Sequence, residues 1–93
     1  QLPSRVYETS SLSADVYWED TVELFWDRQN TTVVGYEVRK NGVYIGFTDG
    51  VTFIDTGLQA GEKPHYDVVA VDRNGDILGF AGIVVQVGTE QCL

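Results

Sequence analysis

Residues 21–27 have the sequence TVELFWD, and the alternation in this stretch decides the fold class. Val22, Leu24 and Trp26 fall on one face of an extended strand, because successive side chains of a strand point to opposite sides. The same period of two recurs in VVGYEVRK (33–40), whereas no window of about 11 residues or more shows the spacing of an amphipathic helix. Both stretches are therefore predicted to be strands with one buried face.

Three dipeptides that favour tight turns, Asn41-Gly42, Asp49-Gly50 and Asn74-Gly75, separate the predicted strands. The strands on either side of each dipeptide are expected to pair antiparallel. Read outward from these turns, the chain is predicted to form an all-β fold, a seven-stranded antiparallel β-sandwich with strands near 11–17, 21–27, 33–40, 43–48, 51–55, 65–72 and 77–87. The first ten residues, QLPSRVYETS, show no clean alternation and are predicted to be a linker or leading arm.

Size and composition limit the function classes. The 93 residues are 43% apolar and contain no stretch near the roughly 20 apolar residues of a membrane-spanning helix, so we expect one soluble domain. A domain this small has little room for both a core and a deep active site, which disfavours an enzyme. The chain has 14 acidic and 6 basic residues, and the net charge of −8 argues against binding to nucleic acid or to an anionic membrane. We interpret the acidity as a solubility feature that names no partner.

Four stretches, in order and at suitable spacing, resemble the fibronectin type III family of bacterial secreted and surface proteins: ELFWD (23–27), VVGYEVRKNG (33–42), FIDTGL (53–58) and YDVVAVDRNGD (66–76). The resemblance covers about residues 10–88. It implies an immunoglobulin-like sandwich and an extracellular or cell-envelope location. The expected organisation is a linker or leading arm at 1–10, a fibronectin type III-like domain at 11–88 and a C-terminal tail at 89–93. The start at Gln1 and the absence of methionine favour a fragment or a processed chain.

The resemblance also implies roles for core residues. Trp26, on the second strand, would lie between the two sheets, and Tyr66, at the start of the sixth, would bond through its hydroxyl to the backbone of the preceding corner. Pattern and resemblance together predict a core made of Leu12, Ala14, Val16, Val22, Leu24, Trp26, Val34, Tyr36, Val38, Ile45, Phe53, Leu58, Tyr66, Val68, Ala70, Ile83, Val85 and Val87.

Two patterns in the sequence partly match metal sites. Asp72, Asn74 and Asp76 match the first ligands of a calcium loop, but Ile77 and Ile83 occupy the positions that need glycine and glutamate, so a hairpin turn is favoured. The only histidine, His65, has no partner for zinc or for nucleophilic catalysis and is predicted to point outward. No metal or cofactor is therefore predicted.

Other candidate chemistry is also weak. A carboxylate pair for glycoside hydrolysis needs a cleft that raises one pKa, whereas a solvated acidic face is expected for Asp15, Glu19, Asp20, Glu23 and Asp27. Asn30-Thr31-Thr32 matches a glycosylation acceptor that matters only in a secreted eukaryotic protein. Cys92 cannot form an internal disulfide; it could tether another chain, cap a disulfide in a longer parent, or do neither. No catalytic residue is predicted.

Outward-pointing apolar residues offer the better functional signal. Alternation directs Tyr17, Phe25 and Ile54 away from the core, with Trp18 at the adjoining turn, and we expect them to form one apolar patch. On the opposite sheet, the residues expected to point outward are Val33, Val69, Val71 and Val84, between Glu37, Asp67 and Gln86. Contiguous apolar surface of this kind marks contact with a partner.

We therefore expect a non-catalytic spacer, scaffold or protein-interaction module of a larger exported multidomain bacterial protein, with its termini at opposite ends. Its partners would be the neighbouring domains of the parent chain. The alternative is a module that recognises polysaccharide or protein through Tyr17, Phe25 and Ile54 with Trp18, or through loops at one end. The stretch DILGFAGIVVQV (76–87), which contains the predicted strand 77–87, is unusually apolar for an edge strand and is expected to promote association, because edge strands without charge pair readily with other chains.

Overall fold

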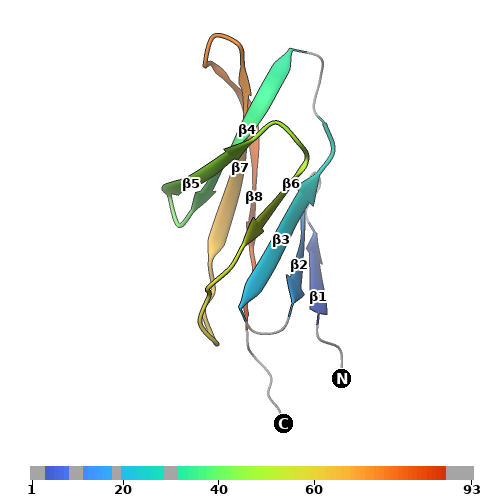
Figure 1. Cartoon of the computed structure of the whole chain (residues 1–93), viewed down its shortest axis with the longest axis vertical. Coiled ribbons are helices and arrows are strands. Elements are labelled where there is room, and N and C mark those ends of the chain that lie inside the picture. Colours follow the sequence, from blue (N-terminus) through green and yellow to red (C-terminus); the bar gives the residue numbers. More distant parts are fainter. Residues whose placement is uncertain (1–3, 9–11, 18–19, 29–31, 88–93) are drawn as a thin grey trace.

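Two antiparallel β-sheets pack face to face in a computed structural model, which describes residues 4–8, 12–17, 20–28 and 32–87 (Figure 1). Sheet 1 has the order β1-β2-β3-β6, and sheet 2 has the order β5-β4-β7-β8. No described residue lies in a helix, so that part of the chain holds no helix able to cross a membrane. The predicted all-β sandwich is confirmed. The strands are β1 (Ser4–Glu8), β2 (Leu12–Tyr17), β3 (Thr21–Trp26), β4 (Val33–Lys40), β5 (Val43–Thr48), β6 (Thr52–Asp55), β7 (His65–Asp72) and β8 (Ile77–Val84).

The described residues form eight strands, and the expected count of seven was wrong. The additional strand is β1, within the segment assigned to a leading arm, and it pairs with β2 from Ser4 opposite Tyr17 to Glu8 opposite Ser13. β1 is an edge strand joined through its backbone to one neighbour, so it does not need the alternating pattern by which the other strands were found.

β1 also changes where the chain enters the sandwich. It runs antiparallel to β2, so Ser4 lies beside the end of β2 that leads into Asp20. The loop after β6 bonds to both that turn and the end of the chain, through Leu58 N to Asp20 O at 3.2 Å and Val87 N to Glu62 O at 2.9 Å. The first and last described residues therefore lie at the same end of the molecule, the lower end in Figure 1, and the expectation of opposite ends was wrong.

Two of the three predicted turns connect paired strands. Asn41-Gly42 joins β4 to β5 with φ values of 53° and 83°, and the turn at Gly75, with φ of 85°, joins β7 to β8. The third, Asp49-Gly50, leads from β5 in sheet 2 to β6 in sheet 1, so the pairing expected there was wrong. Turn chemistry is local and does not determine whether the chain stays in the same sheet.

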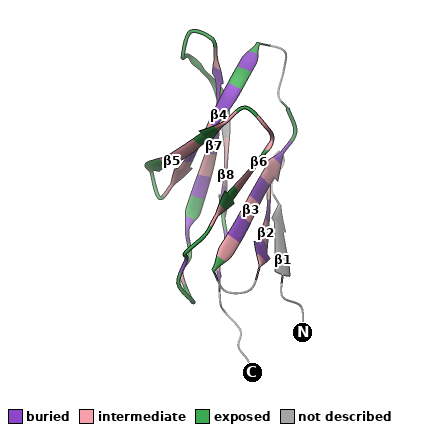
Figure 2. Cartoon of the chain, in the orientation of Figure 1, coloured by how far each residue is buried: buried purple, intermediate pink, exposed green. Residues whose placement is uncertain are grey.

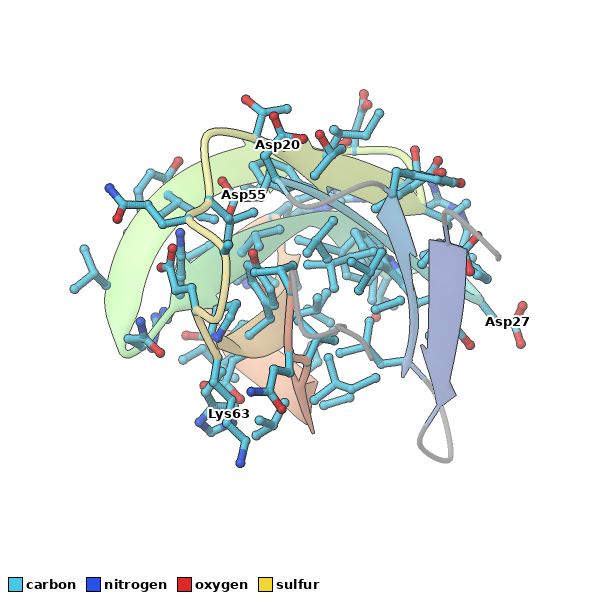
Figure 3. All side chains as sticks on the ribbon, turned by 90° about the horizontal axis from the view of Figure 1, so that it is seen from below. Asp20, Asp27, Asp55 and Lys63 are labelled. Atoms are coloured by element: carbon cyan, nitrogen blue, oxygen red, sulfur yellow. The ribbon has the colours of Figure 1, made fainter. Side chains whose placement is uncertain are left out.

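Apolar side chains from both sheets fill the space between them, as the view along the molecule shows (Figure 3). Trp26 and Tyr36 meet edge to face across this core, with ring centroids 5.3 Å apart and an interplanar angle of 64°. The predicted core positions are buried except for Ile45 and Phe53, which are half-buried against it, and Val34.

Val34 is 44% exposed, and its neighbour Val33, expected to point outward, is buried in the core. The cause is a bulge: Val33 lies opposite Asp72 and Gly35 lies opposite Val71, so β4 has one residue more than β7 between these pairs. One extra residue shifts the alternation, so the core position moves from Val34 to Val33.

A polar contact joins the two sheets at the end where the chain leaves. The Tyr66 hydroxyl donates to Asp55 Oδ2 at 2.6 Å, rather than to the backbone as the resemblance implied. Lys40 Nζ lies 3.2 Å from the same carboxylate oxygen and 3.5 Å from Glu62 Oε2. Burial and the hydrogen bond to Asp55 raise the pKa of Tyr66, in that order of importance. Residues of β4, β6 and β7 are thereby held together.

Candidate interaction surfaces

Three of the four residues predicted to form a patch lie on the outer face of sheet 1. Register places Phe25 opposite Thr52 and Ile54 opposite Glu23, so Phe25 and Ile54 are diagonal neighbours. Ile54 is 57% exposed and Phe25 is half-buried. Trp18, the fourth residue, lies outside the described residues.

Tyr17 is separated from Phe25 and Ile54 by two carboxylates. Asp15 and Glu23 are directly opposite each other on β2 and β3 and occupy the row between Tyr17 and Phe25. The Tyr17 hydroxyl donates to Glu23 Oε1 at 2.7 Å and lies 3.2 Å from Asp15 Oδ2. The hydrogen bond to Glu23, followed by burial and the interactions with Asp15, raises the pKa of Tyr17 to about 12. The outer face of sheet 1 is thus an aromatic and acidic surface, not one continuous apolar patch.

Most of the exposed apolar side chains that are described lie on sheet 2, whose edge strand β5 is exposed or half-buried along its length (Figure 2). Eight large apolar side chains are exposed among those described, which leave out the side chains of β1 and of Phe80, and of these eight only Ile54 belongs to sheet 1. The other seven belong to β4, β5 and β8: Val34, Val43, Tyr44, Phe47, Ile77, Leu78 and Val84.

Cross-strand register assigns four of these residues to the outer face of sheet 2. They lie opposite residues that alternate with core positions of β4 and β7. These four residues are called the sheet-2 patch: Tyr44 opposite Arg39, Phe47 opposite Glu37, Ile77 opposite Val71, and Val84 opposite His65.

The sheet-2 patch extends over a buried floor. Val69 and Val71 alternate with the core residues of β7, yet they are only 4% and 6% exposed, so the expectation that these outward valines would be at the surface was wrong. The Phe47 ring of β5 extends over Gly35 of β4, the residue opposite Val71, so that an added Cβ at Gly35 would meet the ring. A residue pattern shows the direction of a side chain but not how far its neighbours cover it.

This face carries one ion pair, and a second carboxylate lies beside a histidine that is charged only if protonated. Arg39 Nη2 lies 2.9 Å from Glu37 Oε1, and His65 Nε2 lies 3.4 Å from Asp67 Oδ1. On sheet 1, by contrast, no described cation forms an ion pair with Asp15 or Glu23. The two outer faces therefore differ in electrostatic character as well as in apolar exposure.

The other residues singled out from the sequence were candidates for metal binding, for acid catalysis or for modification. Asp72 Oδ1 accepts hydrogen bonds from the backbone of Asn74 and Asp76, at 2.9 and 3.0 Å, which shows that this segment is a side-chain-capped hairpin turn. His65 is exposed, as are Asp20 and Asp27. No group of three or more metal-binding side chains occurs within the described ranges. Predictions that fall outside the described residues concern Glu19, Asn30-Thr31 and Cys92.

The chain is similar in sequence to parts of three bacterial enzymes. It is 38% identical over 74 residues to "Alpha-amylase" of Niallia circulans, 38% over 71 residues to "Chitinase D" of the same species, and 34% over 70 residues to "Chitinase Chi52" of Paenibacillus xylanexedens. The matches cover 77, 74 and 73% of this chain but only 6, 13 and 13% of those proteins. The chain thus spans a small part of the curated relatives it matches.

The fold has a solved counterpart. The structure of Yersinia enterocolitica family 28 exopolygalacturonase contains a region that superposes with a TM-score of 0.70 and 15% identity, covering 97% of this chain and 21% of that one. At this identity the likeness concerns the fold alone. A match that covers 97% of this chain leaves fewer residues unmatched than the five of β1. The matched region therefore includes at least part of β1. No protein-family model matches the chain.

Proposed function

We propose that this chain is a non-catalytic accessory module of a larger, secreted bacterial glycoside hydrolase. The observation that carries the proposal is the pattern of matches: one small β-sandwich corresponds to 6% of a protein named as an amylase and to 13% of proteins named as chitinases. A unit that occurs with enzymes acting on different polysaccharides is unlike a catalytic domain, whose residues are specialised for one substrate.

The distribution of polar groups supports a non-catalytic role. Every buried side chain of the described core is apolar or Pro64, and no charged residue is buried there. General acids and bases acquire shifted pKa values through burial or close charge pairs, usually within a cleft. The carboxylates whose side chains are described instead lie on strand faces, turns and loops.

We also propose that the module is of the fibronectin type III kind. Without β1, the strands β2 to β8 form a seven-stranded sandwich with Trp26 on the second strand and Tyr66 at the start of the sixth, as the resemblance implied. The tyrosine bonds to a carboxylate in place of the backbone, which is a departure from the implied corner.

Hydrolysis assays on the 93-residue chain and on the natural polypeptide that contains it test this function. We expect the isolated chain to release no reducing sugar from starch or chitin. We expect the parent without the module to retain hydrolysis of short soluble oligosaccharides, because the reacting groups belong to another domain. Turnover by the isolated chain, or a parent that cleaves no polysaccharide, contradicts the proposal.

A second candidate function is glycan recognition on the outer face of sheet 1. Phe25 and Ile54 offer an apolar surface beside Glu23, whose carboxylate can accept hydrogen bonds from sugar hydroxyls. Trp18 belonged to this surface in the prediction from sequence. Pull-down of the isolated chain on insoluble starch and chitin tests it, with Phe25→Ala as the variant and Tyr44→Ala, on the other sheet, as the control. Equal binding by both variants removes this candidate.

A further inference from the structure

We propose that the outer face of sheet 2 docks against the neighbouring domain of the same polypeptide. This inference rests on the proposed function, in which the chain is one module of a longer enzyme. Its evidence comes from the unequal properties of the two sheets.

The first observation is the apolar character of the sheet-2 patch. Tyr44, Phe47, Ile77 and Val84 are between 47 and 58% exposed and lie on the two edge strands, one in each of the four rows of cross-strand pairs on this face. The valines beneath them are already buried. A partner that covered these exposed side chains would therefore bury apolar surface on top of the already buried valines, rather than polar backbone.

The second observation is the charge of this face. Among its described charged side chains, Glu37 and Arg39 form an ion pair, and Asp67 lies 3.4 Å from His65 Nε2, which carries a charge only if protonated. Docking an uncharged surface here leaves Glu37 and Arg39 neutralised by each other. Docking on sheet 1 would instead remove water from Asp15 and Glu23, which have no cation partner among the described side chains.

The third observation concerns the two edge strands of sheet 2. Neither VYIGFT (43–48) nor ILGFAGIV (77–84) contains a charged residue, although the chain carries a net charge of −8. Exposed edge strands usually carry charges or proline that prevent association. Both edge strands thus have the composition of strands that a partner covers.

The position of the chain ends indicates which partner covers it. β8 belongs to sheet 2, and Val84 in the sheet-2 patch is three residues from Val87, the last described residue. A domain that follows in the parent chain is joined to the border of this face through residues 88–93 and any further linker, and a short flexible linker gives an effective concentration in the millimolar range. A second copy has no tether and adds a further charge of −8, which opposes self-association.

Hydroxyl-radical footprinting of the 93-residue chain and of the natural parent polypeptide tests the proposal. Ile77 and Ile54 are a matched pair, because both are isoleucine and they are 58 and 57% exposed on opposite sheets. We expect modification of Ile77, Tyr44 and Phe47 to fall several-fold in the parent, while that of Ile54 stays the same. In the parent, Ile77→Lys is expected to restore modification of Tyr44 and Phe47, and Ile54→Lys is not. Both variants should leave the thermal midpoint of the isolated chain unchanged, since both positions are exposed.

Each other outcome identifies a different occupant and overturns the proposal. Equal modification of Ile77 in the isolated chain and the parent means that the face is free. Protection in the isolated chain that increases with concentration and is lost in Ile77→Lys indicates a second copy. Protection that requires added starch or chitin indicates a glycan. Hydrolysis by the same parent preparation is measured separately, so a parent that protects Ile77 but cleaves no polysaccharide refutes the proposed function and leaves the docking face supported.

Discussion

The hydroxyl of Tyr66 on β7 donates a 2.6 Å hydrogen bond to the carboxylate of Asp55 on β6, and this contact connects the two sheets. Tyr66 is fully buried, and Lys40 approaches the same carboxylate oxygen at 3.2 Å. A hydrogen bond to a charged acceptor contributes about 1.5–3 kcal/mol to stability, more than a typical neutral one. We therefore expect this contact to contribute substantially to the stability of the sandwich.

Tyr66→Phe is predicted to lower the free energy of unfolding by about 1.5–3 kcal/mol, because it removes the hydroxyl and keeps the buried ring. Urea denaturation measures this loss. Tyr44→Phe is the matched control, since the Tyr44 side chain is 57% exposed, and its effect should stay within about 0.5 kcal/mol. Equal midpoints for wild type and Tyr66→Phe would show that the contact contributes nothing.

Alkaline pH is predicted to destabilise the protein from about pH 10 upward. The pKa of Tyr17 is raised to about 12 by the hydrogen bond to Glu23, and that of Tyr66 is raised above its ordinary value of 10.0 mainly by burial. Since the unfolded chain loses these protons first, the stabilisation is complete below pH 10 and is lost as pH rises through the folded-state values. Urea midpoints measured across this range should fall, and less steeply in Tyr66→Phe. A midpoint independent of pH between 9 and 12 contradicts this linkage.

Gly46→Ala is predicted to cost about 1–3 kcal/mol, because the new Cβ would lie 2.5 Å from Cε1 of Phe53. That ring is half-buried against the core and has little space to move. Gly35→Ala should cost less, since its close neighbour Phe47 is 49% exposed and can turn toward solvent. Gly79→Ala is the control, because nothing lies within 4 Å of its added Cβ. Thermal unfolding of the three variants gives the order, and a greater loss in Gly35→Ala than in Gly46→Ala would contradict it.

Val33→Ala is predicted to lower the free energy of unfolding by no more than about 1.5–3 kcal/mol, which is the value of burying a whole valine side chain. Val34→Ala should change the free energy of unfolding by less than about 0.5 kcal/mol. The reason is the bulge in β4, which leaves Val33 5% exposed and Val34 44% exposed. The two variants remove the same atoms from adjacent positions, so denaturant midpoints compare them directly. A greater loss of stability in Val34→Ala than in Val33→Ala would contradict the bulge and would favour the uninterrupted alternation expected from the sequence.

Local chemistry was sufficient for the fold class. The period of two in 21–27 and the left-handed conformations of Asn41, Gly42 and Gly75 depend on neighbouring residues only, so the sequence predicted the strands β2 to β8 and two of the hairpins. Burial of Trp26 followed from the same alternation.

Contacts between distant residues decided the candidate surfaces. Tyr17, Phe25 and Ile54 were correctly directed to one face, but only register shows that Asp15 and Glu23 come between them. Likewise, only the tertiary structure shows that the outward-pointing Val69 and Val71 are buried. Direction is a property of one strand, whereas adjacency and coverage are properties of several.

The sequence by itself thus determined a small, acidic β-sandwich with a tryptophan core, because alternation and turn preference are local. Only the tertiary structure decided that β1 returns the chain to the end from which it leaves, since β1 joins by backbone pairing that no side-chain pattern records. Tertiary structure likewise decided that Tyr66 bonds to Asp55, because the two residues lie in different sheets and meet only when the sheets pack.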